Sequence, residues 1–285
     1  IVSLLVGIAI GQGALPGTAS PLLGFYPERT DLLTDAPPRR ARITLAHLLG
    51  MSSGLHWDEG ALPNDETRLF WTADLPAYVL GRPFDSEPGE RFLYNSGGTA
   101  LLADVLVRSQ GKSLSALARE QLFEPMGIRD WVWATDMRGR ELAFTGLRMR
   151  PRDLAKLGQL VLDGGRWQGR QLVPAAWIGE ATSTHLQTPV RLPGASGRTF
   201  GYGYQWWTGS APWQGRPMAW SAGFGNGGQR LYTVPDLGLV VAISAGGYGS
   251  HAINAAVHAL FERIVTAAQP LPVRTLATPD ATPPR

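Results

Sequence analysis

Residues 87–98 read Glu-Pro-Gly-Glu-Arg-Phe-Leu-Tyr-Asn-Ser-Gly-Gly and separate a polar loop from an apolar segment. The Pro-Gly pair at 88–89 predicts a turn, because proline presets φ and glycine accepts a positive φ. The Gly-Gly pair at 97–98 loosens the backbone just before a helix that we predict over residues 99–110. Tyr94 lies between the two pairs. By itself such a residue is typical of a half-buried tyrosine whose hydroxyl finds a backbone partner, so a chemical role must be argued from the rest of the chain.

The composition is that of a globular protein. The chain has 285 residues, of which 44% are apolar and 17% charged, and it contains 35 Gly and 22 Pro. This length allows one large domain or two lobes around a sizeable core, with many turns. The formal net charge is only +3 and Lys and Arg are scattered, so nothing indicates a nucleic-acid partner.

The sequence does not indicate a metal or cofactor site. The chain has no cysteine, which excludes disulfides, thiolate zinc sites and a cysteine nucleophile. Its five histidines show no ligand spacing. We therefore expect neither a metal nor a cofactor. The compartment stays open, because a cysteine-free chain is compatible with both cytoplasm and periplasm.

Both ends of the chain have a distinct composition. The first ten residues form an apolar run that is too short to span a bilayer, which takes about 20 residues. The run also fits the apolar part of a signal peptide, but no initiator Met or basic segment precedes it. We favour a buried helix at 1–11 whose N-terminal continuation is missing. Residues 269–285, rich in Pro, Thr and Ala, predict a disordered tail, which leaves 1–268 as one domain.

The periodicity of apolar residues changes once along the chain. Capping and apolar patterns predict helices at residues 45–49, 72–80, 99–110, 113–122, 151–162 and 174–182. After Gly201 the pattern is typical of strands, at residues 202–207, 218–221, 229–234 and 237–244, before a last amphipathic helix at 250–267. This order indicates an α+β fold, an antiparallel sheet flanked by helices. It has a helical lobe over about 43–182 and sheet strands over about 201–244.

Several further motifs accompany Tyr94 in a fixed order along the chain. They are Ile-Thr-Leu-Ala-His-Leu-Leu-Gly-Met-Ser-Ser-Gly-Leu at 43–55, Pro-Arg-Asp-Leu-Ala at 151–155, Gly-Gly-Arg-Trp at 164–167, Gly-Tyr-Gly-Tyr-Gln-Trp-Trp at 201–207 and a Gly-Gly-Gln at 227–229. Together they resemble the serine β-lactamase family. The similarity covers about residues 1–265 and is greatest for the branch of class C enzymes, esterases, D-alanyl-D-alanine peptidases and 6-aminohexanoate-dimer hydrolases. It implies a β-lactamase/transpeptidase-like fold.

The resemblance implies acyl transfer on a small-molecule ester, amide or peptide-like substrate, without a cofactor. In that family a serine attacks a carbonyl, a lysine one helical turn later and a tyrosine share the proton transfers, and backbone N–H groups bind the oxyanion. It implies that Tyr94 is the general base and acid and that Ser96 is a hydrogen-bonding residue of the same motif. A tyrosine, whose reference pKa is about 10, becomes a base only where nearby cations favour the phenolate.

The third motif of the family departs from its usual composition here. Relatives carry Lys or His at its start, whereas this chain has Ser-Ala-Gly at 221–223, with no cation. The substrate carboxylate is then met by another residue, or the substrate lacks one, which favours an esterase or amidase over a β-lactamase. By resemblance, the residues that border the oxyanion hole and the substrate are Ser221, Gly223, Gly227, Gly228 and Gln229.

The family's nucleophile motif, Ser-x-x-Lys, is expected a few residues upstream of Ile1. Without it we expect the chain as given to be inactive, and to leave a sheet edge and one face of the first helix uncovered. A second hypothesis is therefore a catalytically inactive binding module with the same fold.

Two serine motifs invite other interpretations. Residues 109–112 read Ser-Gln-Gly-Lys, but Gly111 is expected to end a helix, so the lysine does not lie one helical turn from the serine. Residues 50–54 match the Gly-x-Ser-x-Gly nucleophile elbow, with Ser52 at its centre. That elbow needs a strand before it, whereas a helix is predicted here, so we expect Ser52 to be a turn residue.

Trp57 and Glu59 stand in a polar segment that we expect to be a surface loop with an exposed indole. Two interpretations remain equal. The two side chains line the entrance for a substrate, as the corresponding region does in relatives, or the tryptophan only anchors the loop.

Overall fold

The computed structural model describes residues 1–32, 38–60, 64–190 and 199–269. The expected disordered tail lies, apart from its first residue, outside these ranges. The helices are α1 (Val2–Gly11), α2 (Leu45–Leu49), α3 (Asp65–Arg68), α4 (Leu75–Leu80), α5 (Ser96–Gln110), α6 (Leu114–Ala118), α7 (Pro151–Leu162), α8 (Ala175–Ala181) and α9 (His251–Ala267). Short 3₁₀ turns occur at Leu22–Phe25, Thr30–Leu32, Arg40–Arg42 and Pro235–Leu237, and a π turn at Arg119–Phe123 extends α6.

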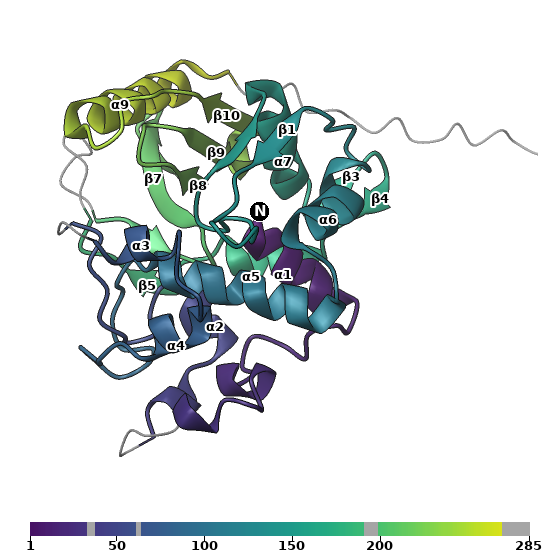
Figure 1. Ribbon diagram of the computed structural model, residues 1–285. Helices are drawn as coiled ribbons and strands as arrows, with labels where there is room; N and C mark the ends of the chain where they lie inside the picture. Colours follow the sequence, from purple (N-terminus) through teal and green to yellow (C-terminus); the bar gives the residue numbers. More distant parts are fainter. Residues whose placement is uncertain (33–37, 61–63, 191–198, 270–285) are drawn as a thin grey trace, which may run out of the picture.

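One antiparallel sheet dominates the upper half of the molecule in Figure 1, with the helices α2–α5 below it. Its spatial order is β10-β9-β8-β7-β6-β5. These strands are β5 (Leu186–Gln187), β6 (Gly201–Tyr202), β7 (Trp207–Trp213), β8 (Arg216–Phe224), β9 (Arg230–Val234) and β10 (Leu239–Ile243). Helices before strands in the chain and antiparallel pairing throughout this sheet confirm the predicted α+β fold.

The sheet is covered on both faces. Successive residues of a strand point to opposite faces, so Leu231 and Tyr232 of β9 show what covers each one. Tyr232 stacks on Phe261 of α9, with ring centroids 3.7 Å apart. Leu231 packs on the other face, where a Cβ at Gly158 of α7 would lie 2.8 Å from it, so α7 comes this close only because it has a glycine there. The core therefore has two apolar layers, one on each side of the sheet.

The helical part is built around α1 and α5, which lie side by side. Residues 2–9 of α1 are buried on all sides, as predicted for a helix that is apolar all round. The expectation that one face of this helix is uncovered is wrong. Trp177 of α8 lies directly over Gly7, where a Cβ would be 2.2 Å from the indole.

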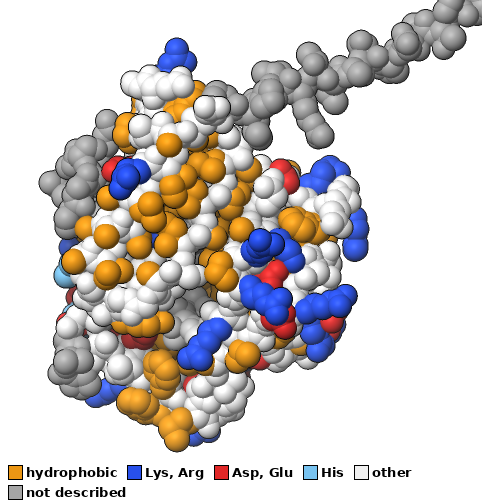
Figure 2. All heavy atoms as spheres, turned by 90° about the horizontal axis from the view of Figure 1, so that it is seen from above, with side chains coloured by type: hydrophobic (Ala, Val, Ile, Leu, Met, Phe, Trp, Pro, Cys, Tyr) orange, Lys and Arg blue, Asp and Glu red, His pale blue; other side chains and the backbone are white. Residues whose placement is uncertain are grey.

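The sheet edge that we expected to be uncovered is present. Within the part of the chain that the structure describes, β10 pairs only with β9 and so ends the sheet. Figure 2 shows apolar side chains gathered on the face seen from above, the side on which α9 and β10 lie in Figure 1. Ile253 and Leu260 of α9 are 38% and 45% exposed.

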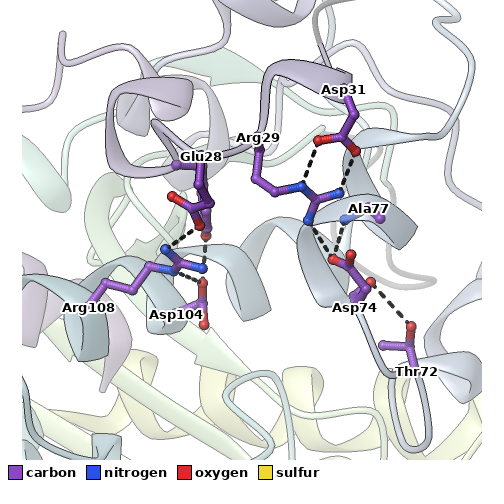
Figure 3. Close-up of polar contacts among 9 residues, drawn as sticks. Glu28, Arg29, Asp31, Thr72, Asp74, Ala77, Asp104 and Arg108 are labelled. Carbon is purple, nitrogen blue, oxygen red and sulfur yellow. Dashed lines mark hydrogen bonds and ion pairs between the residues drawn. The ribbon is translucent and has the colours of Figure 1, made fainter.

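The long connection that follows α1 is held against the helical lobe by ion pairs (Figure 3). Arg29 donates to Asp31 and to Asp74, the N-cap of α4. Arg108 of α5 donates to Asp104, at 2.9 Å, and to Glu28, at 2.8 Å. The segment around residue 28 is thereby held against both α4 and α5.

Two local expectations are corrected. Helix α5 begins at Ser96 and not at residue 99, because Asn95 caps it, its Oδ1 accepting from the Gly98 N–H at 2.9 Å.

Residues 202–207 are not one strand. They form a tight turn between β6 and β7 in which Gln205 takes a φ of 63°. Gln205 also ties the sheet to the lobe, since its N–H donates to Leu49 O and its amide to the hydroxyl of Thr99.

Short two-stranded elements went unpredicted. They are the pair β1 (Trp131–Trp133) and β2 (Leu147–Met149) and the pair β3 (Arg166–Trp167) and β4 (Arg170–Gln171). Segments of two or three residues are too short to show a periodicity.

Candidate active site

Tyr94 lies where the helical lobe meets the sheet. The backbone on either side of it is fixed by Met51, whose carbonyl accepts from the Leu93 N–H at 2.8 Å and whose sulfur accepts from the Asn95 N–H at 3.3 Å. Met51 has a φ of 54°, a left-handed conformation that few residues other than glycine adopt. The motif at 43–55 therefore positions the tyrosine through its backbone.

The ring of Tyr94 stacks on the sheet. It faces the indole of Trp207 with ring centroids 6.1 Å apart and an interplanar angle of 14°. Trp207 in turn stacks on Phe224, at 5.4 Å and 15°. Tyr94 keeps 36% of its surface exposed, and its hydroxyl has no hydrogen-bond partner among the described residues. The phenol group is therefore available for chemistry.

Ser96 is buried directly beside the tyrosine and makes two polar contacts. Its N–H donates to Glu59 Oε1 at 2.9 Å, and its hydroxyl donates to Glu66 Oε2 at 3.3 Å. The hydroxyl is thus already engaged by a carboxylate. Glu66, at the start of α3, had not been singled out from the sequence, since a lone glutamate in a polar segment carries no signal.

The charges around Tyr94 are negative. Although the residue is 36% exposed, desolvation of its hydroxyl raises the pKa of Tyr94 above its ordinary value, and the charges of Glu59 and Glu66 raise it further. Burial, followed by the charge of Glu59, also raises the pKa of Glu66. In the part of the chain that the structure describes, neither carboxylate forms an ion pair with a lysine or arginine. With these neighbours alone Tyr94 is a neutral phenol at pH 7 and not a base.

Several polar groups of the third-motif region are hydrogen-bonded to one another or to neighbouring strands and loops. The Ser221 hydroxyl forms a 2.7 Å hydrogen bond with that of Thr233, inside the sheet. The side chain of Gln229 accepts from the Gly227 N–H at 3.0 Å and donates to Ala245 O at 2.8 Å, so it braces the loop between β8 and β9. In contrast, a Cβ placed on Gly223 would meet no atom within 4 Å, so open space lies beside it.

A buried cation close to this motif was missed from the sequence. Arg230 is 3% exposed, and its guanidinium lies 4.4 Å from the centroid of the Phe224 ring. It donates to Gly225 O and to Asn254 of α9. Burial lowers its pKa. The arginine stands at the far end of the stack that begins with Tyr94 and holds the loop after β8 in place.

The indole of Trp57 is not exposed as expected. It is 3% exposed, packs edge-on against Tyr78 with centroids 5.9 Å apart, and donates its Nε1–H to Glu59 at 2.9 Å. The expectation failed because the polar residues around it fold back on themselves: the Asp65 N–H donates to Asp58 O, and the Asp58 N–H donates to the Asp65 carboxylate.

Both serine motifs have the structure expected of turns. Gly111 ends α5 with a φ of 64°, and Lys112 donates to Glu120, away from Ser109. Ser52 is buried after the short helix α2, and its hydroxyl donates to the carbonyl of His47. Among the described residues, each serine hydroxyl donates only to a backbone carbonyl, that of His47 for Ser52 and that of Leu106 for Ser109.

One cavity among the described residues lies away from Tyr94. It has a volume of about 420 Å³, and residues of the β5 to β8 edge and of α9 line it, among them Thr184, Trp220 and His258. Tyr94 does not line it. Among the described residues there is no group of His, Cys, Asp and Glu that would hold a metal, and no helix with the length and apolar character of a membrane span.

Comparisons with known proteins agree with the resemblance seen in the sequence. A family model described as Beta-lactamase matches residues 12–260. The 6-aminohexanoate-dimer hydrolase of Paenarthrobacter ureafaciens is 25% identical over 247 residues, which is 81% of this chain and 60% of that protein. Penicillin-binding protein 4* of Bacillus subtilis (strain 168) is 24% identical over 222 residues, 64% of this chain and 46% of that protein. The chain thus spans about half to three fifths of the length of these relatives.

The fold agrees as well. The solved structure of a putative 6-aminohexanoate-dimer hydrolase from Bacillus anthracis superposes with a TM-score of 0.70 at 21% identity, covering 92% of this chain and 70% of that one. The predicted β-lactamase/transpeptidase-like fold is confirmed.

Proposed function

The chain belongs to the β-lactamase family, and on this basis we propose that it is a serine hydrolase that cleaves an ester or an amide through an acyl-enzyme. The observation that carries the proposal is the phenol of Tyr94. Its hydroxyl has no hydrogen-bond partner among the described residues, and its ring stacks on Trp207. A structural tyrosine in such surroundings would bond its hydroxyl to a neighbour.

The mechanism follows from the family chemistry. A serine hydroxyl attacks the carbonyl carbon, its proton passes to a neighbouring base, and the leaving alcohol or amine takes a proton as the bond to the carbonyl breaks. Water then attacks the acyl-enzyme and restores the serine. Tyr94 is the proposed carrier of the proton between serine, leaving group and water.

Tyr94 needs a cation for this task. The carboxylates of Glu59 and Glu66 keep it protonated, and a nearby ammonium would offset them and lower its pKa. The lysine of a Ser-x-x-Lys motif is the proposed source. In the family this motif directly precedes a helix that resembles α1, so we place it before Ile1.

The substrate is proposed to be an ester or amide whose recognition does not depend on a carboxylate. Ser221 stands where relatives carry a cation, and its hydroxyl is engaged by Thr233. The name of the Paenarthrobacter relative points to an amide of 6-aminohexanoate as one candidate class. The open space beside Gly223 is where the acyl group is proposed to lie.

A binding module without catalysis is the second candidate, favoured by the negative surroundings of Tyr94. Mass spectrometry of the natural full-length protein after treatment with a fluorophosphonate or a penicillin separates the two. An adduct on a serine just before Ile1 supports the hydrolase. An adduct on Ser52 or Ser96 contradicts the proposed mechanism, and no adduct on folded protein favours the binding module.

A further inference from the structure

Residues 57–60 and 64–66 pack against the start of α5. Asp65 accepts from the Asp58 N–H at 2.9 Å and pairs with Arg82, and its carbonyl accepts from the hydroxyl of Tyr78 at 3.0 Å. The side-chain amide of Asn64 donates to Glu59 O at 3.3 Å. The described residues of this segment are therefore anchored to α4, and the direction of the Glu59 side chain is set by that anchoring.

One oxygen of Glu59 joins the segment to α5. Glu59 Oε1 accepts from the indole N–H of Trp57 and from the backbone N–H of Ser96, both at 2.9 Å. Ser96 is the first residue of α5, whose N–H has no partner within the helix. A carboxylate at this position accepts a hydrogen bond from the free N–H, and its negative charge interacts favourably with the positive end of the helix dipole.

The indole of Trp57 completes the contact. A Cβ on Gly97 would lie 2.7 Å from Trp57 Cη2, so the edge of the indole packs against the first turn of α5 where another residue would have a side chain. This explains why a glycine stands inside the helix. Trp57, Glu59 and the first turn of α5 thus form one packed unit directly after Tyr94.

Glu66 supplies a second contact from the same segment. Its Oε2 accepts from the hydroxyl of Ser96 at 3.3 Å. The two carboxylates therefore hold the two polar groups of one serine, and their charges act on the tyrosine two residues before it, whose pKa they raise.

We propose that Glu59 is a positioning residue for the Tyr94 to Ser96 motif, acting through the Ser96 N–H and the Trp57 indole, and that Glu66 orients the Ser96 hydroxyl. The catalytic importance of this inference rests on the proposed function. The positioning itself does not, because it depends only on contacts within this chain. Trp57 and Glu59 then act from behind the motif and do not line a substrate entrance.

The arrangement has an electrostatic consequence. Among the described residues, the groups that stack on Tyr94 or interact with its charge are Trp207 and Tyr202 from the sheet and the carboxylates of Glu59 and Glu66. Only the two carboxylates are charged. Removal of one charge should therefore make the phenolate easier to form, and the Glu59→Gln variant does this while keeping an oxygen for the two N–H donors.

Amide hydrogen exchange in the natural full-length protein tests the positioning. In Glu59→Ala the Ser96 amide should exchange about 10-fold faster or more, because the variant removes the charged acceptor of its hydrogen bond, and hydrogen bonds to charged groups are the stronger ones. Glu59→Gln should restore most of the protection, and Glu124→Gln, at an exposed carboxylate far from the site, should change nothing. Unchanged exchange at Ser96 in Glu59→Ala, or an equal acceleration at the β9 amides, would overturn the proposal.

The protonation of Tyr94 provides the second readout. With ¹³C-labelled tyrosine, the signal that disappears in Tyr94→Phe is followed against pH. It should titrate at lower pH in Glu59→Gln than in Glu124→Gln, and an identical titration would also overturn the proposal. Both readouts are independent of turnover, so failure to find a serine adduct would reject the hydrolase and leave the positioning role standing.

Discussion

Tyr94 and Trp207 stack face to face across the junction of the helical lobe and the sheet, with ring planes 14° apart. The tyrosine belongs to the connection before α5 and the tryptophan is the first residue of β7, so the contact joins elements more than a hundred residues apart in the chain. Because stacked aromatic pairs contribute beyond their buried area, this contact fixes the proposed proton carrier relative to the strand that borders the open space at Gly223.

Tyr94→Phe separates chemistry from packing. The hydroxyl has no partner among the described residues and the ring remains, so the free energy of unfolding should stay within about 0.5 kcal/mol of the original. In the natural full-length protein, kcat should fall by about 10²–10⁴ if the hydroxyl carries the proton. Turnover at the original rate, measured on an ester substrate, would rule out this role.

Trp207→Ala should be strongly destabilising. Trp207 is 8% exposed and packs on Tyr94, Phe224 and Tyr202, and large-to-small changes of buried aromatics cost about 3–5 kcal/mol. Trp71→Ala is the matched control, because Trp71 is 57% exposed and its loss should cost about 0.5 kcal/mol or less. Urea unfolding of both variants measures the difference. Equal losses would mean that the stack adds nothing to stability.

Two glycine substitutions in helices should have opposite effects. Gly97→Ala places a Cβ against Trp57 and Val79, at 2.7 and 2.9 Å, and overpacking of this kind costs about 1–3 kcal/mol. Gly179→Ala in α8 meets no atom within 4 Å and should stabilise by about 0.5–1 kcal/mol through the higher helix propensity of alanine. Thermal unfolding shows whether each variant is less or more stable than the original protein. A Gly97→Ala variant that is more stable would contradict the packing of the Trp57 indole against Gly97.

The long helices and strands, and the order of the motifs along the chain, could be predicted from the sequence because each of these features depends on many residues. The helix α7 and the antiparallel run from β8 to β10 are of this kind. The start of α5 was misplaced because its two glycines look like a breaker, whereas Gly97 is required by the packing of Trp57, which is distant in sequence. The turn at Gln205 was missed for a related reason. A left-handed glutamine has no local signature, and here its contacts with Leu49 and Thr99 stabilise it.

The electrostatics of the site were beyond sequence reasoning. Tyr94 was identified by its motif, but the sign of the charge around it depends on where Glu59 and Glu66 point. Both come from a polar segment without periodicity, and their convergence on Ser96 follows from the anchoring by Asp65 and Arg82.

His258 should make stability depend on pH. It is 2% exposed, its Nδ1 is 2.9 Å from the hydroxyl of Tyr232, and burial, followed by the charge of Arg230, lowers its pKa to about 4. Between pH 4 and 6.5 the unfolded state binds a proton that the folded state does not. Stability is therefore complete above pH 6.5 and is lost as pH falls toward 4, by at most about 3 kcal/mol. His258→Gln should remove this slope, and His251→Gln, at an exposed position, should not. A slope that persists in His258→Gln would refute the assignment.

Asp74 tests the polar network of Figure 3, because it has two separable roles. Its Oδ1 accepts from the Ala77 N–H at 2.9 Å as the cap of α4 and from Arg29 at 2.7 Å as an ion-pair partner. Asp74→Asn keeps an oxygen for the cap and loses the ion pair, which at an exposed position is worth about 0.2–1 kcal/mol and weakens with salt. Asp74→Ala loses both and should cost about 1 kcal/mol more, because capping contributes about 0.5–2 kcal/mol. Unfolding in urea at low and high salt distinguishes the two roles. If Asp74→Asn destabilises as much as Asp74→Ala at low salt, the ion pair and not the cap holds the connection after α1 to α4.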